Sequence, residues 1–143
     1  MEKTKIMVFG TFDGIHKGHL NLLKQARRLA RKPFLIVLIA RDKNVLKIKK
    51  RKTIYIEKER MKLVKKSQLA DKVILGSVNN YLANILKEKP AIIALGYDQK
   101  AYVKELKKDL KNKKLNIKIM RLKSHKPHIY KNSLLNISKF KRN

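Results

Sequence analysis

The sequence contains no cysteine and no tryptophan, and only five glycines and three prolines among its 143 residues. The absence of cysteine excludes a disulfide framework, a thiolate metal site and a cysteine nucleophile. No apolar run approaches the length of a membrane span, and the segment MEKTKIMVFG at the start holds too short an apolar run for a secretory signal. We therefore expect a cytoplasmic protein made of a single domain.

Acidic residues are also scarce: 10 Asp and Glu stand against 38 Lys and Arg, which gives a formal net charge of +28. Such a field attracts polyanions, so nucleic acid has to be considered as a partner. However, the lysines are spread over every expected helix, and the few aromatic residues do not interleave with basic residues as single-strand binding platforms require. Nucleic acid is therefore the less expected partner, and the charge favours small anionic substrates.

Short apolar segments alternate with helical patterns along most of the chain. The apolar segments are nearly continuous and rich in Ile, Val and Leu, which is typical of parallel strands buried on both faces. The alternation predicts an α/β fold, a Rossmann-like, doubly wound sheet of about five parallel strands with flanking helices. The expected strands are Ile6–Phe9, Phe34–Ala40, Val73–Leu75, Ala91–Leu95 and Ile117–Met120, and the expected helices are Leu20–Arg31, Ile56–Gln68, Asn79–Glu88 and Lys100–Lys113.

Two segments do not fit this alternation. Arg41–Thr53 has no periodicity and is highly basic, which predicts a long functional loop. From Ser124 onward we expect a loop and then a short helix over about Asn132–Phe140. The predicted domain accordingly spans residues 1–143, with a core at about 4–122 and a C-terminal loop and helix at about 123–143.

The most informative stretch is GTFDGIHKGH, which lies between the first expected strand and the first expected helix. Ligands of open α/β sheets bind at the carboxyl ends of strands, and a helix N-terminus offers free N–H groups and a positive dipole to a phosphate. His16 and His19 are three residues apart, so both project from one face of the first turn. Gly18 has no Cβ, which lets a phosphate approach the backbone. We interpret the two imidazoles as groups that hold a reacting phosphoryl centre.

Metal binding is the main alternative for the two histidines. Paired metal-binding histidines on a helix are usually four residues apart, and no acidic residue lies between His16 and His19. A Walker-type phosphate loop is excluded, because GxxxxGK[ST] does not occur. The identity of any metal ligands is therefore unknown at this point.

The stretch GTFDGIHKGHLNLLKQA resembles the nucleotidyltransferase superfamily that carries the His-x-Gly-His signature. Its members include FAD synthases, glycerol-3-phosphate cytidylyltransferases and phosphopantetheine adenylyltransferases. The resemblance continues through ARDKNV, KERMKLV, ADKVILG and ALGYDQ, and so covers nearly the whole chain. It implies transfer of a nucleoside monophosphate from a nucleoside triphosphate to a phosphate-bearing acceptor, with release of pyrophosphate. Mg²⁺ would accompany the triphosphate.

The resemblance also implies roles for individual residues. His16 and His19 would stabilise the transition state, and Lys47, Lys49 and Lys50 would close over the phosphates. Asp13 and Asp42 would border the acceptor. The residues implied in nucleotide binding are Gly10, Thr11, Phe12, Gly18, His19, Arg60, Gly96, Asp98 and Ser133.

The substrates are less clear from the sequence. Glycerol-3-phosphate cytidylyltransferases typically carry Arg-Thr-Glu-Gly-Ile-Ser near the C-terminus, whereas RLKSHKPHIYKNSLL lacks the Glu-Gly pair. LGYDQ and the basic segment look more like the short archaeal-type FAD synthases. We therefore expect AMP transfer from ATP to FMN, with CTP:glycerol-3-phosphate cytidylyltransferase as the alternative. Candidates for contact with the flavin ring are Tyr97, Tyr102 and Tyr130.

Two further alternatives stay open. One is a nucleotide-fold protein that binds nucleic acid and has lost its activity, although the intact His16, Gly18 and His19 argue against such a loss. The other concerns assembly, for which a homodimer is possible.

Overall fold

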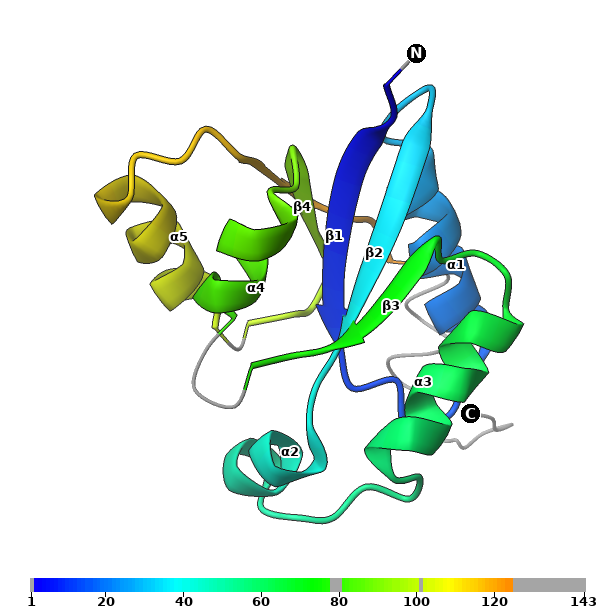
Figure 1. The fold of residues 1–143 in the computed structure, drawn as a ribbon. Helices are drawn as coiled ribbons and strands as arrows, with labels where there is room; N and C mark the ends of the chain where they lie inside the picture. The colour runs from blue at the N-terminus through cyan, green and yellow to red at the C-terminus, as the bar shows by residue number, and fades with distance from the viewer. Residues whose placement is uncertain (1, 78–80, 101, 125–143) are drawn as a thin grey trace.

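The computed structural model describes residues 2–77, 81–100 and 102–124 and holds one five-stranded sheet, shown in Figure 1. All neighbouring strands are parallel, in the order β3-β2-β1-β4-β5. This arrangement confirms the α/β fold predicted from the sequence. The strands are β1 (Thr4–Gly10), β2 (Pro33–Ile39), β3 (Lys72–Leu75), β4 (Ile92–Leu95) and β5 (Lys118–Arg121).

Helices cover both faces of the sheet because successive residues of the central strands point apolar side chains to opposite faces. Ile6 and Val8 of β1 point into one core cluster, and Met7 and Phe9 point into the other. Helices α1 (Lys17–Arg27) and α3 (Glu57–Lys66) supply buried residues to the first cluster, and α4 (Leu82–Glu88) and α5 (Val103–Asn112) supply them to the second. Figure 1 shows the two helix pairs on opposite sides of the sheet.

The strand order places a topological switch point at the central strand. From β1 the chain runs outward through β2 to β3, and then crosses to β4 and β5 on the other side. A crevice opens at the carboxyl ends of strands where the winding reverses, and ligands of open α/β sheets bind there. The stretch that follows β1 lies at this point of the fold.

The segment 41–53, predicted to be a loop, contains the helix α2 (Asp42–Lys49), so that prediction was wrong. The helix buries only Val45, and the other apolar residues in it, Leu46 and Ile48, are exposed. A helix with one buried side chain has no apolar stripe for the sequence to reveal. Its first turn is held instead by the distant Glu57, whose carboxylate accepts the Asp42 N–H at 2.9 Å.

Other boundaries differ by a few residues. Helix α1 begins at Lys17, three residues before the expected start, because His16 caps it, and it ends at Arg27 rather than Arg31. The helix expected at 132–140, together with Ser133, lies outside the described residues. Across the part of the chain that the structure describes, no helix has both the length and the apolar character needed to cross a membrane.

Candidate active site

The two signature histidines form a reciprocal cap at the N-terminus of α1. His16 is the N-cap residue, and its Nδ1 accepts the N–H groups of Gly18 at 2.9 Å and His19 at 3.4 Å. In return, the His19 Nδ1 accepts the His16 N–H at 3.3 Å. The two rings stack with their centroids 3.9 Å apart. The sequence pattern is thus a capping box in which imidazole nitrogens take the place of the usual Ser and Glu oxygens.

This geometry fixes the protonation state of both rings. A nitrogen that accepts a backbone N–H carries no proton, so each neutral ring holds its proton on Nε2. Burial lowers the pKa of His16 below its ordinary value. Burial, the neighbouring His16 and the Lys49 cation lower the pKa of His19 to about 4. At neutral pH the pair is therefore uncharged and has two Nε2–H donors.

The glycine between the histidines is needed for the ring of His16. A Cβ at Gly18 would lie 2.7 Å from the His16 Cε1 and 3.0 Å from its Nδ1, well inside contact distance. From the sequence alone, close approach of a phosphate was the reason for a glycine at this position. The structure adds a second reason, because any larger residue would displace the capping imidazole.

The turn after β1 is conformationally strained and closely packed. Phe12 has a left-handed backbone with φ of 51°, an arrangement that costs a non-glycine residue about 1–2 kcal/mol. Its buried ring lies 5.3 Å from the His19 ring, and a Cβ at Gly10 would overlap it. Burial of the aromatic ring offsets the backbone cost. Gly10 and Phe12 together thus form the support on which the His19 ring rests.

Arg60 on α3 connects three segments around this turn. Its guanidinium is fully buried and donates to the Thr11 carbonyl at 2.7 Å, to the Asp42 carboxylate at 2.6 Å and to the Tyr55 carbonyl at 3.1 Å. With no exposed atom, the side chain of Arg60 offers nothing to a ligand directly in this structure. It positions the backbone of Thr11 and the start of α2.

The two carboxylates expected near the acceptor are engaged in the same region. Partial burial raises the pKa of Asp42, but hydrogen bonds from Arg60, the Glu57 N–H and Thr53 outweigh burial and hold that pKa below its ordinary value. Asp13 accepts the N–H groups of Ile54 and Tyr55 at 2.7 and 2.8 Å. Asp13 therefore ties the segment after α2 to the turn after β1, and Asp42 ties the start of α2 to Thr53 and to α3.

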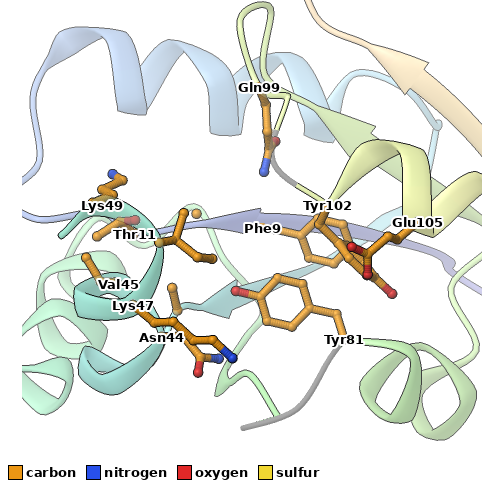
Figure 2. Close-up of a pocket in the computed structure, with 13 residues that line it drawn as sticks. Phe9, Thr11, Asn44, Val45, Lys47, Lys49, Tyr81, Gln99, Tyr102 and Glu105 are labelled. Atoms are coloured by element: carbon orange, nitrogen blue, oxygen red, sulfur yellow. The ribbon is translucent and has the colours of Figure 1, made fainter.

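A cavity of about 420 Å³ opens at the carboxyl ends of β1 and β2, a size typical of small-molecule sites (Figure 2). Its two sides differ in chemistry. Helix α2 contributes Asn44, Lys47 and Lys49 on one side. The opposite side is aromatic and acidic and is formed by Phe9, Tyr81, Tyr102 and Glu105. Gly10, Thr11, Ala40, Val45, Ile48 and Gln99 complete the lining.

The cavity and the histidine pair adjoin each other. Lys49 lines the cavity and also acts electrostatically on His19. Thr11 lines the cavity as well, one residue before the Phe12 ring that contacts His19. Thr11 and Lys49 therefore connect the cavity lining to the histidine pair.

The loop after β4 is held rigidly beside the cavity. Arg121 at the end of β5 donates to the carbonyls of Gly96 at 2.8 Å and Gln99 at 2.6 Å. The Gln99 side chain accepts the Gly96 N–H at 3.1 Å. Asp98 lies exposed in the turn between them, and Leu22 of α1 would lie 3.2 Å from a Cβ at Gly96.

The structure places the predicted site residues in two groups. Gly10, Thr11, Lys47 and Lys49 line the cavity, whereas His16, Gly18, His19 and Phe12 are absent from its lining and gather at the N-terminus of α1. Lys50 instead ends α2 in a left-handed conformation and is absent from the lining, as is Asp98. Their roles, and that of Ser133, stay predictions.

Several lining residues were not found from the sequence. Tyr81 and Glu105 belong to helices whose patterns indicated only burial and surface, and Gln99 is an ordinary polar residue in a turn. Asn44 and Ile48 lie in the helix mistaken for a loop. The one available signal was the motif ALGYDQ, which pointed to the loop that contains Gln99.

The described residues do not provide a site for a resident metal ion. Within residues 2–77, 81–100 and 102–124, no group of three His, Asp or Glu side chains is placed to hold one. The Nδ1 atoms of both histidines accept backbone N–H groups, and Asp13 and Asp42 are engaged as described.

Comparison with known proteins agrees with this geometry. The model of the cytidylyltransferase-like family matches residues 7–138, and the chain belongs to that family. It is 44% identical over 119 residues to an FAD synthase of Korarchaeum cryptofilum, covering 82% of this chain and 80% of that protein. It is 42% identical over 121 residues to an FAD synthase of Methanothermus fervidus, covering 84% and 83% respectively.

A solved structure shows the same fold. A lipopolysaccharide core biosynthesis protein of Thermoplasma volcanium aligns with a TM-score of 0.78 and 31% sequence identity, over 87% of this chain and 99% of that one. The family membership and the similarity to relatives named FAD synthase make the chain a nucleotidyltransferase.

Proposed function

We propose that the protein is an FMN adenylyltransferase, which transfers AMP from ATP to the phosphate of FMN and releases pyrophosphate. The observation that carries the proposal is a neutral imidazole pair at a helix N-terminus, next to a cavity with cationic and aromatic sides. The similarity to archaeal proteins named FAD synthase, 37–44% identical over most of the chain, supports this choice of substrates.

The reaction needs alignment and charge stabilisation more than a protein base. The FMN phosphate has a second pKa of about 6, so it is largely a dianion at neutral pH and needs no deprotonation. One of its oxygens forms a bond to the α-phosphorus of ATP, and the bond from that phosphorus to the oxygen of the leaving pyrophosphate breaks. Negative charge develops on the equatorial and leaving oxygens in the transition state.

The residues of the site match these requirements. The Nε2–H groups of His16 and His19 donate hydrogen bonds to the reacting phosphate oxygens. Both rings are uncharged, and each keeps its Nε2 proton throughout the reaction. Lys47 and Lys49 supply positive charge from α2. The positive end of the α1 dipole adds to the same effect. Magnesium bound with ATP would screen the triphosphate, and Gly96, Asp98 and Ser133 are proposed to bind the nucleotide.

The test crosses two nucleotides with two acceptors. Purified protein is incubated with MgATP or MgCTP and with FMN or glycerol-3-phosphate, and both pyrophosphate and FAD are measured. We expect FAD and pyrophosphate in equal amounts from ATP and FMN. Faster pyrophosphate release from CTP and glycerol-3-phosphate would replace this proposal by a cytidylyltransferase. Size-exclusion chromatography with light scattering on the same sample tests whether the protein forms a homodimer.

A second outcome separates an enzyme from a binding protein. Absence of pyrophosphate with every pair, together with nucleic-acid binding that weakens steeply with salt, would support the non-enzymatic alternative. Binding that neutralises several phosphates loses orders of magnitude in affinity between low and moderate salt, whereas a nucleotide held in a pocket loses far less.

A further inference from the structure

Three aromatic rings on the wall of the cavity form one packed cluster. Phe9 and Tyr81 stack with ring centroids 5.1 Å apart and planes inclined by 22°. Tyr102 meets both rings edge to face, at 6.1 Å from Phe9 and 5.2 Å from Tyr81. The cluster draws its members from β1, from the residue before α4 and from the residue before α5, and all three rings line the cavity.

The rings have different degrees of exposure. Phe9 is only 5% exposed and belongs to the core, whereas Tyr81 and Tyr102 are half-buried at the cavity. In Figure 2 the Tyr81 ring faces the space between α2 and α5, and its hydroxyl points toward α2. Phe9 thus packs against the Tyr81 ring and fixes its position. We refer to the Tyr81 ring in this position as the platform.

Other contacts hold the platform in place. A Cβ at Gly76 would lie 2.5 Å from the Tyr81 Cε1, so this glycine makes room for the ring at the end of β3. Tyr102 has a left-handed backbone with φ of 68°, and its hydroxyl donates to the Asp109 carboxylate at 3.3 Å. A core built only for stability would not need a strained residue to turn a tyrosine toward a cavity.

The charged side chains of the cavity indicate how a ligand would be oriented on the aromatic cluster. Lys47 and Lys49 lie on α2 opposite the rings, and Lys49 also acts on His19. The phosphate of a ligand would therefore lie at the end near Lys49 and the histidines, and a planar aromatic group would lie at the far end. Glu105 beside Tyr102 offers a carboxylate to N–H or hydroxyl donors at that end.

We infer that Tyr81, supported by Phe9 and flanked by Tyr102, selects an acceptor with a large planar ring by stacking against it. This inference rests on the proposed function for the identity of the acceptor, a flavin phosphate. The inference names Tyr81 as the residue by which the protein distinguishes FMN from small phosphate esters such as glycerol-3-phosphate. Tyr97, also considered from the sequence, does not line the cavity, and Tyr130 lies outside the described residues.

The test compares Tyr81→Leu and Tyr81→Phe with wild type. Loss of a base-stacking aromatic ring typically costs about 1–3 kcal/mol, which corresponds to about a 5- to 150-fold change in affinity. Tyr81→Leu is expected to raise the KM for FMN within that range and to leave the KM for ATP within twofold. Tyr81→Phe keeps the ring and is expected to match wild type. Tyr81→Phe is therefore the matched control for loss of the ring.

Binding of FMN alone gives an independent readout. Stacking on tyrosine quenches flavin fluorescence, so titration of FMN with protein reports the contact without ATP. Quenching by wild type and Tyr81→Phe, with loss of quenching and of affinity in Tyr81→Leu, supports the inference. An unchanged FMN affinity and KM in a Tyr81→Leu variant with wild-type thermal stability overturns it.

The two proposals fail in different ways. Wild-type protein that makes no FAD refutes the proposed function, and the fluorescence titration still decides whether Tyr81 holds a flavin. Wild-type protein that makes FAD with a KM independent of Tyr81 refutes only the inference. A Tyr81→Leu variant that melts early is replaced by Tyr81→Met, which keeps most of the volume without a ring.

Discussion

His16 and His19 each accept the backbone N–H of the other through Nδ1, at 3.4 and 3.3 Å, while their rings stack at 3.9 Å. One pair of residues therefore caps the helix and carries the proposed chemistry. The two roles use different atoms of each ring, because Nδ1 accepts a backbone N–H and the proposed chemistry uses Nε2–H. This division allows the roles to be separated by substitution.

The first prediction separates capping from catalysis at His16. Asparagine is a favoured N-cap residue that retains an acceptor near the position of Nδ1 but lacks the Nε2–H donor. His16→Asn should keep the stability of the wild type within about 0.5 kcal/mol and lose about 10²–10³ in kcat. His16→Ala should lose similar activity and about 1 kcal/mol of stability. Urea unfolding and steady-state FAD formation measure the two effects, and near-wild-type kcat in His16→Asn would refute the catalytic role.

The second prediction concerns acid stability and His19. Its folded-state pKa of about 4 lies below the ordinary value of 6.5, so the unfolded chain binds more protons between these pH values. The contribution of this residue to the free energy of unfolding is therefore complete above pH 6.5 and is lost as the pH falls toward 4. The lowered carboxylate pKa values of Asp13, Asp42 and Asp71 act at lower pH, below about 3.8.

His19→Asn removes this titration and keeps an acceptor for the His16 N–H. The thermal midpoint of wild type should fall more steeply than that of His19→Asn between pH 6.5 and 4, and the two should run parallel above pH 7. Nitrogen NMR of the wild type at pH 7 should show the neutral, Nε2-protonated form of both rings. Parallel curves throughout, or an imidazolium signal at pH 7, would contradict the proposed protonation state.

The third prediction is that Gly18→Ala reduces activity without reducing stability. Alanine inside a helix is favoured over glycine by about 1 kcal/mol, but its Cβ would lie 2.7 Å from the His16 Cε1. The imidazole can swing away, so the strain is relieved by moving the ring that carries the donor. Because the lost cap offsets the gain from alanine, we expect a thermal midpoint close to that of wild type and a kcat lowered by about tenfold to a hundredfold. Activity equal to wild type would show that the His16 ring position is unimportant.

Much of the fold was predictable because burial on both faces leaves a clear pattern in the sequence. All five strands were identified, since each is a short apolar run. Helix α2 was missed for the opposite reason. Only Val45 is buried in it, and its first turn is held by Glu57, which is distant in the sequence. A contact between residues far apart in the chain leaves no local periodicity.

The site residues also divide into those that the local sequence indicates and those that only tertiary packing places. The closeness of His16, Gly18 and His19 was predictable because the three residues lie within one turn, whereas their roles stay predictions. Arg60 was expected at the nucleotide through resemblance, and its burial under Thr11 appears only in the folded chain. Tyr81 has no motif of its own, because its place on the cavity wall depends on the packing of Phe9 and on the space left by Gly76. Tertiary packing, rather than local sequence, assembles that side of the cavity.

The last prediction follows from the fully buried guanidinium of Arg60, which donates to the Thr11 and Tyr55 carbonyls and to Asp42. Arg60→Met would leave these acceptors without their donor and should lower the free energy of unfolding by about 2–3 kcal/mol, since Asp42 is partly exposed. Arg60→Lys supplies one ammonium group for the three acceptors. Its free energy of unfolding should lie between that of wild type and that of Arg60→Met. Arg27→Met, at a more exposed pair with Asp71, should cost about 1 kcal/mol or less. If Arg60 positions Thr11 and α2, the lysine variant, measured well below its melting temperature, should also show a raised KM for ATP. A stable Arg60→Met variant with wild-type KM and kcat would show that the buried guanidinium neither holds the fold nor aligns the site.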